Sequence, residues 1–314
     1  MESGDEDIHT KIENYLTDNF GEVGKKIHTG KSRNDQILTD IKLFEKDNLS
    51  QIAKQIIELS KIFKNYSSKY KAVPMPGYTH MQKAMPTSVG MWAESFAESC
   101  KDDLKIINNA IKLIDKSPLG SAAGYGVNLP LDKQYTAKLL GFSGVQNIPN
   151  YCQNSKGKMD LVVIGALHNV MLTINKFASD VMLFTTSEFG FFDVDKKLCT
   201  GSSIMPQKKN VDVAELLKAK THKVLGNFVQ VAGIVSNLIS GYNRDFQETK
   251  KPIMESFEIV LSSLKATKLL IIGLTPDVAK LKAAMTDELY ATQKALDLVA
   301  KGISFRDAYK LIKK

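Results

Sequence analysis

Apolar side chains recur at steps of three and four residues over long stretches of the chain, with polar residues between them. From residue 36 to about 70 the apolar positions are Ile37, Ile41, Phe44, Ile52, Ile56, Leu59 and Phe63. This spacing places one apolar stripe along a helix and predicts a long amphipathic helix. The same test predicts four further long helices, over 86–115, 158–188, 211–240 and 252–274.

Proline and glycine mark the ends of these predicted helices. Pro86 and Pro252 stand near two predicted starts, while Gly190 and Gly241 follow two predicted ends. Each helix has roughly 25 to 35 residues and spans about 35 to 50 Å, so each needs packing partners along its whole length. The helix at 158–188 is apolar on more than one face, which favours burial on several sides inside a bundle or between subunits.

Strand patterns are almost absent. The aromatic run "FGFFDVD" at 189–195 is the one short candidate, and it lies between a helix end and a loop. After about Thr275 the pattern changes to short amphipathic pieces, which indicates a small helical C-terminal domain. The predicted fold class is all-α, an elongated five-helix bundle with small helical flanking domains, in an oligomeric protein.

Composition agrees with a globular protein. The chain has 314 residues, of which 43% are hydrophobic and 24% charged. His168 and Asn169 interrupt the longest apolar stretch before it reaches the roughly 18 apolar residues of a membrane span. The opening "MESGDEDIHT" is acidic and lacks the apolar region of a secretory signal, so we expect a cytoplasmic protein.

Charge and cysteine content exclude several functions. The net charge is +8, but the lysines are spread at helical spacings along the predicted helices and do not cluster with aromatic residues. We therefore expect neither a nucleic-acid nor a membrane partner. Cys100, Cys152 and Cys199 are odd in number and have no C-x-x-C spacing, which favours reduced thiols over disulfides or a zinc site.

Polar, often glycine-rich loops connect the predicted helices, and loops on a rigid scaffold commonly carry function. They read "HTGKSRNDQ" (28–36), "PGYTHMQ" (76–82), "GSAAGYGVNLP" (120–130), "GSSIMPQKKN" (201–210) and "GYNRDFQETK" (241–250).

The first of these loops offers groups that can bind a carboxylate. The planar fork of Arg33 suits a carboxylate, and Ser32 and Asn34 add neutral donors beside it. Alternatively, Ser32, Asn34 or Asp35 caps the following helix. Both interpretations can hold together, because the free N–H groups at a helix start also bind anions.

The second loop contains a histidine suited to proton transfer. The Pro-Gly pair at 76–77 predicts a turn that presents Thr79 and His80. Histidine can exchange a proton near neutral pH, although a lone histidine is more often structural. His168 and His222, within predicted helices, are interpreted as structural.

The fourth loop combines two serines with two lysines. Backbone N–H groups of the Gly-Ser-Ser turn, together with Lys208, could stabilise a substrate carboxylate or a serine oxygen. A serine alkoxide that acts as a base needs such help, because a hydroxyl is weakly acidic. The residues alone do not choose between Ser202 and Ser203.

The loop Gly201–Asn210 resembles the GSSxMPxKxN loop of the fumarase/aspartase superfamily. Within it, "EDIHT" (6–10), "HTGKSRNDQ", "PGYTHMQ" and "YNRDFQETK" resemble the argininosuccinate lyase family in particular, over about residue 5 to the end. The resemblance implies three helical domains and a homotetramer whose subunits pack their five-helix bundles in a shared core. It also implies active sites built from loops of different subunits.

The implied reaction splits argininosuccinate into arginine and fumarate by anti elimination, a step of arginine biosynthesis that uses no cofactor and no metal. By motif position, Ser202 is the base, and Lys208 and Asn210 stabilise the aci-carboxylate dianion. His80, oriented by Glu215, lies on the proton-donating side. For Glu215 the alternative is an acidic residue favoured near a helix start by the helix dipole.

The remaining matched positions would contact or support the substrate. They are Ser32, Arg33, Asn34 and Thr79 at the succinyl carboxylates, Tyr242, Gln247 and Lys250 at other substrate groups, and Asp7 and His9 in a supporting role.

Relatives of this kind usually extend further at both ends, so the chain looks like a member trimmed at both ends, with uncertain activity. The expected divisions are 1–35, the remainder of an N-terminal domain with a substrate loop; 36–275, the central bundle; and 276–314, an incomplete C-terminal domain. Alternative functions are another fumarate-releasing lyase, such as adenylosuccinate lyase, or a non-catalytic structural relative like some eye-lens crystallins.

Overall fold

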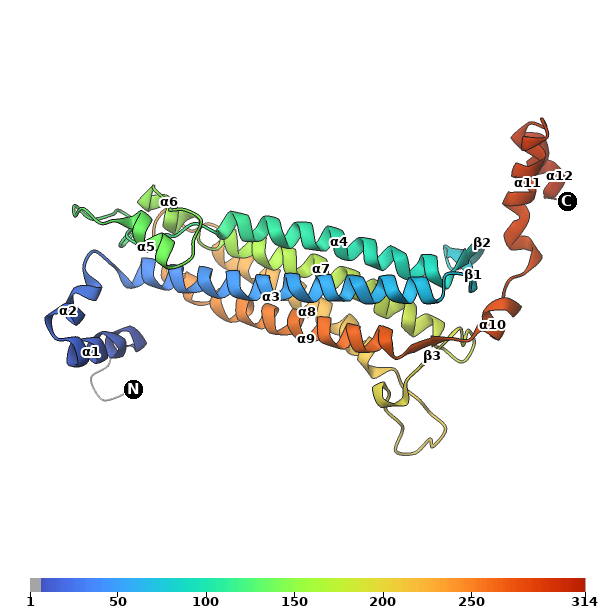
Figure 1. Cartoon of the computed structure of the whole chain (residues 1–314), viewed down its shortest axis with the longest axis horizontal. Helices are drawn as coiled ribbons and strands as arrows, with labels where there is room; N and C mark the ends of the chain where they lie inside the picture. Colours follow the sequence, from blue (N-terminus) through green and yellow to red (C-terminus); the bar gives the residue numbers. More distant parts are fainter. Residues whose placement is uncertain (1–6, 314) are drawn as a thin grey trace. The chain divides into compact units, whose positions relative to one another are not determined.

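The computed structural model describes residues 7–313 of the chain, so residues 1–6 and 314 of the predicted terminal domains lie outside the described residues. Within this range the five longest helices have 23 to 37 residues. They are α3 (Arg33–Lys69), α4 (Val89–Ile114), α7 (Lys158–Phe184), α8 (Asp212–Val235) and α9 (Lys250–Ile272) (Figure 1). The five predicted long helices and the all-α class are confirmed.

Shorter elements fill the connections. The helices are α1 (Ile8–Phe20), α2 (Glu22–Lys25), α5 (Lys133–Leu139), α6 (Pro149–Asn154), α10 (Val278–Ala283), α11 (Ala291–Ala300) and α12 (Phe305–Ile312). The 3₁₀ turns are η1 (Lys26–His28), η2 (Lys196–Leu198), η3 (Arg244–Gln247) and η4 (Asp287–Tyr290). The strands are β1 (Pro74–Thr79), β2 (Gln82–Ser88), β3 (Phe192–Val194) and β4 (Leu274–Pro276), which pair antiparallel as β1–β2 and β3–β4.

The predicted start of the second long helix is wrong. Pro86 lies in β2, opposite Pro76 of β1, and α4 begins only at Val89. Proline cannot donate to a strand ladder, but it is tolerated where a strand has a free edge, as both strands of a two-stranded hairpin do. The proline that suggested a helix start is therefore a strand residue.

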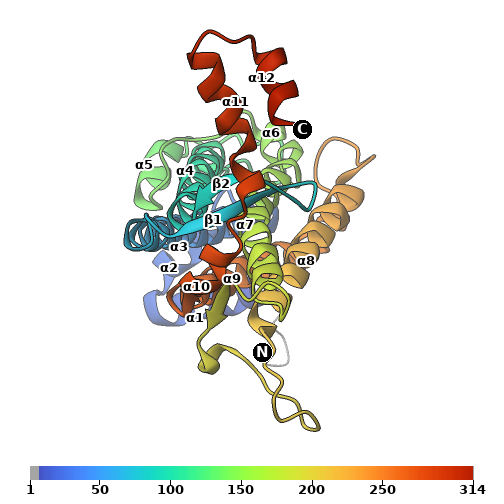
Figure 2. The same cartoon turned by 90° about the vertical axis from the view of Figure 1, so that its right-hand side faces the viewer.

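The chain forms two compact units, each built from three stretches of sequence. Unit 1 comprises Met1–Ala53, Ile106–Leu167 and Val224–Glu258, and unit 2 comprises Lys54–Lys105, His168–Lys223 and Ile259–Lys314. Within each unit, segments of the five long helices run side by side (Figures 1 and 2).

Aliphatic side chains dominate the core of unit 1. Leu49 and Ile52 of α3 and Ile164 of α7 are fully buried, which stabilises the fold by about 1.5–3 kcal/mol for each side chain. The rings of Phe44 in α3 and Phe257 in α9 meet edge to face, with centroids 5.4 Å apart. These contacts hold the helices on which the unit 1 loops are mounted.

Aromatic side chains form the core of unit 2. The ring of Phe177 in α7 lies 5.1 Å from that of Phe63 in α3 and 5.4 Å from that of Phe96 in α4. Trp92 of α4 packs on Phe192 of β3 at 5.1 Å. The cluster fixes the helix ends and the short strand from which the unit 2 loops project.

The segment Pro149–Phe184 is long and apolar enough to cross a membrane by length and composition alone, but half of its most apolar window is buried inside the protein. Ile164, Leu167, Met171 and Phe177 on α7 are completely buried. Burial of this kind is what a core helix of a bundle shows, and such a helix passes the same test of length and composition.

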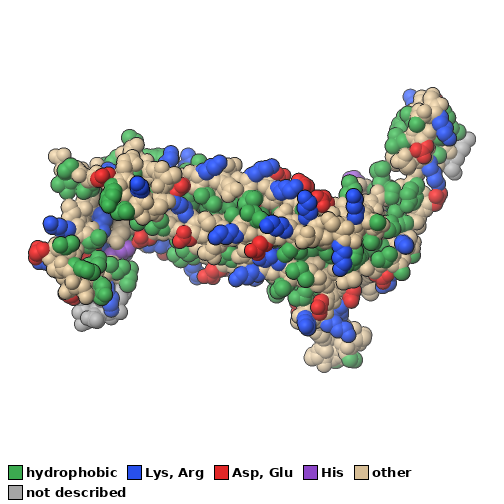
Figure 3. Space-filling model, viewed as in Figure 1, with side chains coloured by type: hydrophobic (Ala, Val, Ile, Leu, Met, Phe, Trp, Pro, Cys, Tyr) green, Lys and Arg blue, Asp and Glu red, His purple; other side chains and the backbone are tan. Residues whose placement is uncertain are grey.

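Charged side chains are dispersed over the helices. On the face shown in Figure 3, lysines and arginines lie among acidic and apolar side chains and do not gather in one patch. On α4, Lys101 pairs with Glu98 and Lys105 with Asp102, each pair three residues apart. On this face the charged side chains therefore lie on solvated helix surfaces.

Candidate active site

The predicted site residues belong to both units. Unit 1 contains those of segments 7–9, 32–34 and 242–250, while unit 2 contains those of segments 79–80 and 202–215. The geometry of each group is described by itself.

Arg33 of unit 1 is held by groups of its own chain. Its Nε lies 3.0 Å from Asp7 Oδ2, its Nη1 lies 3.0 Å from Glu13 Oε1, and its Nη2 donates to Thr10 Oγ1 at 2.9 Å. All three nitrogens of the guanidinium thus contact α1 or its cap. In the single chain the fork ties α1 to the start of α3, and its contact with a substrate carboxylate stays a prediction.

The acidic partners of Arg33 are themselves fixed. Asp7 caps α1, accepting from the backbone N–H of Thr10 at 2.9 Å, and this bond lowers the pKa of its carboxyl. Burial raises the pKa of Glu13, but hydrogen bonds from His28 and Arg33 outweigh it and leave the pKa lowered. His9 is buried, and its Nδ1 has no partner within residues 7–313.

The side chains of Ser32 and Asp35 each accept a backbone hydrogen bond at the start of α3. Ser32 Oγ accepts from the N–H of Asn34 at 3.3 Å, while Asp35 Oδ1 accepts from the N–H of Ser32 at 2.9 Å. These bonds satisfy N–H groups that a helix start leaves free, as in a capping box. The predicted capping role is confirmed for Ser32 and Asp35, and it fixes the backbone around Ser32 and Asn34.

Asp35 also holds a second predicted loop. Its Oδ2 accepts from the N–H of Gly120 at 2.9 Å and from that of Ala122 at 2.8 Å, and the side chain is fully buried. Gly120 and Ala122 both have positive φ, 91° and 52°, so their N–H groups can turn towards one carboxylate. One side chain thus joins the loop at 28–36 to the loop at 120–130.

Three predicted substrate contacts lie together in unit 1. Gln247 Nε2 donates to the hydroxyl of Tyr242 at 3.1 Å, and Lys250 Nζ donates to Gln247 Oε1. The ammonium of Lys156 lies over the Tyr242 ring, 5.6 Å from its centroid. Burial lowers the pKa of Lys156 to about 8, against the attraction of Asp160.

The β1–β2 hairpin of unit 2 presents His80 and Thr79. Thr79 pairs with Gln82, which leaves His80 and Met81 as the two turn residues, with φ of 52° and 62°. Both side chains point into solvent. The predicted turn at the Pro-Gly pair 76–77 is wrong, because these residues lie inside β1, where the register shifts after Pro76.

The loop at 201–210 closes at its base. Thr200 and Asn210 exchange both backbone hydrogen bonds, N–H of Thr200 to Asn210 at 3.0 Å and the reverse at 2.9 Å. Asn210 Nδ2 also donates to the carbonyl of Gly201 at 3.3 Å. Next to this closure, Lys209 pairs with Asp193 at 2.6 Å. The loop is therefore a defined unit whose ends are locked together.

Ser202 differs from its neighbour within this loop. Its Oγ accepts from the backbone N–H groups of Ile204 at 3.3 Å and Met205 at 3.1 Å. In the part of the chain that the structure describes, Ser203 Oγ receives no such bond. Two N–H groups directed at one hydroxyl oxygen favour negative charge on it.

The other predicted groups of unit 2 are exposed. Lys208 lies on the solvent side of the loop, and Glu215 lies in the first turn of α8. Among the described residues of the single chain, no hydrogen bond joins His80 to Glu215 or to Ser202. The chain alone does not form the predicted pair of His80 and Glu215.

Comparisons with known proteins identify the family. A family model described as lyase matches residues 1–226. Argininosuccinate lyase of Thermotoga neapolitana is 44% identical over 98% of this chain and 77% of its own length. That of Sorangium cellulosum is 41% identical over 98% of this chain and 71% of its own length, and that of Phocaeicola vulgatus is 40% identical over 99% and 70%. The chain belongs to the argininosuccinate lyase family. It is therefore a member of a family of enzymes.

This member of the argininosuccinate lyase family has the same fold as several solved structures. EDDS lyase in complex with formate superposes with a TM-score of 0.87 at 22% identity, over 96% of this chain and 60% of that one. A class II fumarase from Schistosoma mansoni gives 0.76 at 19% identity, over 90% and 64%. The chain thus spans less than two thirds of these two proteins, and the likeness confirms the fumarase/aspartase-like helical fold.

Two features of the site region were not predicted as functional. Asp35 was considered only as a cap, and its distance of three residues from Ser32 fits the one bond of a capping box that the structure shows, from the N–H of Ser32 to Asp35 Oδ1. Lys156 was not singled out at all. Nothing in the run "NSKGK" indicates that this lysine, and not Lys158, is the buried one.

Proposed function

We propose that this chain cleaves argininosuccinate to arginine and fumarate by anti elimination. The observation that carries the proposal is that relatives 40–44% identical over at least 98% of the chain are argininosuccinate lyases. The loop geometry supports it, because Ser202 lies where two N–H groups can stabilise a serine alkoxide.

Ser202 is the base that removes a proton from the succinyl carbon next to a carboxylate. An ordinary hydroxyl is too weakly acidic for this task, and the N–H groups of Ile204 and Met205 lower that barrier by stabilising the oxygen anion. Ser203 lacks comparable donors among the described residues, which favours Ser202.

Lys208 and Asn210 stabilise the charge that develops on the substrate. Proton removal beside a carboxylate makes an aci-carboxylate dianion, so cations and amide donors must face the second negative charge. Both residues belong to the closed loop that carries Ser202. Ser202, Lys208 and Asn210 are therefore held in fixed positions relative to one another by the same loop.

His80 and Glu215 complete the site across subunits. His80 supplies a proton to the leaving guanidinium nitrogen, and Glu215 orients its ring. The single chain leaves both exposed and unconnected, which supports a homotetramer in which loops of different copies meet.

The remaining residues bind or position the substrate. Ser32, Arg33, Asn34 and Thr79 bind the succinyl carboxylates, and Arg33 also holds the loop of Ser32 and Asn34 through its bonds to α1. Further contacts and support come from Tyr242, Gln247, Lys250, Asp7 and His9.

Exposed apolar side chains support association of copies. Leu225 and Val229, one turn apart on α8, are 41% and 61% exposed, so they offer apolar surface that another copy of the chain can cover. A cytoplasmic location without membrane or nucleic-acid partners stays a prediction. The division at 1–35, 36–275 and 276–314 also stays a prediction.

Fumarate release tests this function directly. The purified protein is mixed with argininosuccinate, and ultraviolet absorbance of fumarate is followed, with adenylosuccinate as the matched alternative substrate. We expect fumarate from argininosuccinate alone. A confirmed tetramer that releases fumarate from neither substrate would contradict the proposal, and release from adenylosuccinate alone would reassign it.

A further inference from the structure

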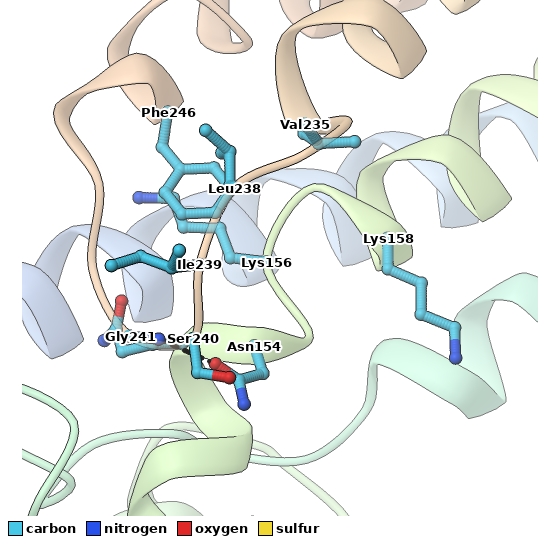
Figure 4. A pocket seen from close by; sticks show the side chains of 10 residues that line it. Asn154, Lys156, Lys158, Val235, Leu238, Ile239, Ser240, Gly241 and Phe246 are labelled. Atoms are coloured by element: carbon cyan, nitrogen blue, oxygen red, sulfur yellow. Dashed lines mark hydrogen bonds between the residues drawn. The ribbon is translucent and has the colours of Figure 1, made fainter.

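A pocket of about 250 Å³ lies in unit 1, beside the turn between α6 and α7 and the segment that follows α8 (Figure 4). Its polar lining includes Gln153, Lys156 and Lys158, and its apolar wall includes Val235 and Phe246. Among the described residues that line it, two are lysines and none is acidic. The pocket is thus shaped and charged for a small anionic group attached to an apolar stem.

Gln153 provides unused hydrogen-bonding capacity at this pocket. The side chain is completely buried, and neither Oε1 nor Nε2 has a partner within residues 7–313. Buried polar groups are nearly always bonded, so such a pair of atoms indicates a missing partner. Asn154 differs, because its Oδ1 accepts from the N–H of Gly241 at 2.8 Å and its Nδ2 donates to Asn150.

Lys156 provides a buried cation at the same place. The residue is 3% exposed, and its ammonium lies 5.2 Å from the Phe246 ring centroid. No hydrogen-bond acceptor for this ammonium occurs in the described part of the chain. Asp160 acts on it electrostatically, but its own carboxylate accepts from Thr249 at 3.5 Å. A buried ammonium without an acceptor is strongly stabilised by a carboxylate.

The pocket adjoins the group of Tyr242, Gln247 and Lys250. Lys156 faces the Tyr242 ring from the pocket side, and Tyr242 is bonded to Gln247, which in turn accepts from Lys250. A ligand bound through these three residues would place its far end near Lys156.

We propose that this pocket binds the α-carboxylate of the arginine half of the substrate, with Lys156 as its cationic partner and Gln153 as its amide partner. The inference rests on the proposed function. The side chains of Val235 and Phe246 then pack against the methylene groups of the arginine half, and Lys156 discriminates in favour of substrates that carry an amino-acid carboxylate.

L-arginine and agmatine test the proposal, because agmatine has the same guanidinium and carbon chain without the carboxylate. Isothermal titration calorimetry of the assembled protein measures the affinity of each. A charge-assisted bond predicts that arginine binds at least about tenfold more tightly than agmatine. Lys156→Met weakens arginine binding by roughly tenfold or more and leaves agmatine binding within about twofold.

Lys101→Met is the matched control. Lys101 is an exposed lysine on α4 whose partner is Glu98, so its replacement leaves both affinities unchanged. Kinetics give a second measurement: Lys156→Met raises KM for argininosuccinate with a smaller change in kcat, as expected of a residue that binds a group away from the reacting carbon.

Ser240→Glu tests the pocket if Lys156→Met does not fold. Ser240 lines the pocket and is exposed, so a carboxylate there leaves the core intact and competes for Lys156. It weakens arginine binding and spares agmatine. Equal affinities of the wild type for the two ligands, or equal losses in either variant, would overturn the pocket assignment. If the proposed function is wrong, the protein does not release fumarate. The two tests are independent, because the binding measurements can be made without turnover of argininosuccinate.

Discussion

Ser202 and Ser203 are adjacent, yet their hydroxyl oxygens have different surroundings. Two backbone N–H groups point at Ser202 Oγ, whereas Ser203 Oγ receives none among the described residues. The pattern of the loop alone could not separate the two serines, because both fit a site for negative charge. The conformation of the loop distinguishes them, and it favours the same serine as the motif position does.

Replacing each serine by alanine tests this difference. Ser202→Ala is expected to lower kcat by roughly 10²- to 10⁴-fold, the usual contribution of a positioned proton-transfer group, and Ser203→Ala by less than about tenfold. Fumarate release under saturating argininosuccinate gives both values. The reverse order of effects would assign the base to Ser203.

Asp35→Asn tests the most heavily bonded carboxylate of the site region. Asp35 accepts from three backbone N–H groups, those of Ser32, Gly120 and Ala122, and an amide in its place would direct N–H groups at some of these donors. We expect a loss of about 2 kcal/mol or more in the free energy of unfolding, measured by urea denaturation. Asp18→Asn, on the exposed side of α1, is the control. Equal stabilities of the two variants would contradict the bonding described.

Polar residues inside the protein were the least predictable from the sequence. Lys156 and Asp35 are buried because distant segments supply their partners, such as Phe246 for Lys156 and Gly120 for Asp35. The spacing of neighbouring residues gives no information on such distant partners. The Gly201–Asn210 motif, by contrast, is continuous in the sequence, so its match to the superfamily pattern could be recognised from the sequence alone.

At the scale of elements, the long helices were predictable and the hairpin was not. The periodicity of apolar positions reflects the geometry of a single helix, so it predicted α3 to within a few residues of its observed Arg33–Lys69. The β1–β2 hairpin contains Pro76, Gly77 and Pro86, which indicated turns and a helix start. Its true turn at His80 and Met81 has no glycine, so the usual marker of a two-residue turn was missing.

Arg33→Met tests the attachment of α1 to α3. Arg33 bonds to Asp7, Thr10 and Glu13, and methionine retains bulk but no donor. We expect faster amide hydrogen exchange throughout α1 with unchanged exchange in α9, because only the bonds to α1 are lost. Arg306→Met, at an exposed position of α12, is the matched control. Unchanged exchange in α1 would show that its attachment does not depend on Arg33.

Asp103 of α4 makes the stability of unit 2 sensitive to pH. Burial raises the pKa of this carboxyl from 3.8 to about 6, although Thr173 donates to it. The folded protein therefore keeps a proton that the unfolded chain releases, and the free energy of unfolding falls as pH rises from about 4 to about 6.

Asp103→Asn removes this ionisation. We expect the variant to be more stable than the wild type by about 1–3 kcal/mol above pH 7. The advantage is lost below about pH 4, where Asp103 of the wild type becomes protonated in both the folded and the unfolded protein. Urea denaturation across this pH range measures the difference. An advantage that does not depend on pH would show that the ionisation of Asp103 is not its source.

At the scale of the whole molecule, the proposed site depends on more than one copy of the chain. His80, Ser202 and Glu215 are not bonded to one another among the described residues of a single chain. Sequence spacing cannot reveal such an arrangement, because it says nothing about contacts between copies; the shared site came from the resemblance.

Mixing two inactive variants tests the sharing of sites between copies. His80→Asn and Ser202→Ala each disable every site in their own homotetramer, but mixed tetramers contain some sites with an intact His80 and an intact Ser202. We expect fumarate release to reappear after subunit exchange, with each variant exchanged against itself as the control. Mixed tetramers, verified by native mass spectrometry, that stay inactive would place His80 and Ser202 of one site in the same subunit.

The backbone bonds between Thr200 and Asn210 predict how the loop between them can move. Because the two ends of the loop are hydrogen-bonded to each other, we expect any displacement to carry residues 201–210 together. The proposed base Ser202 would then keep its position relative to Lys208 and Asn210 from one turnover to the next.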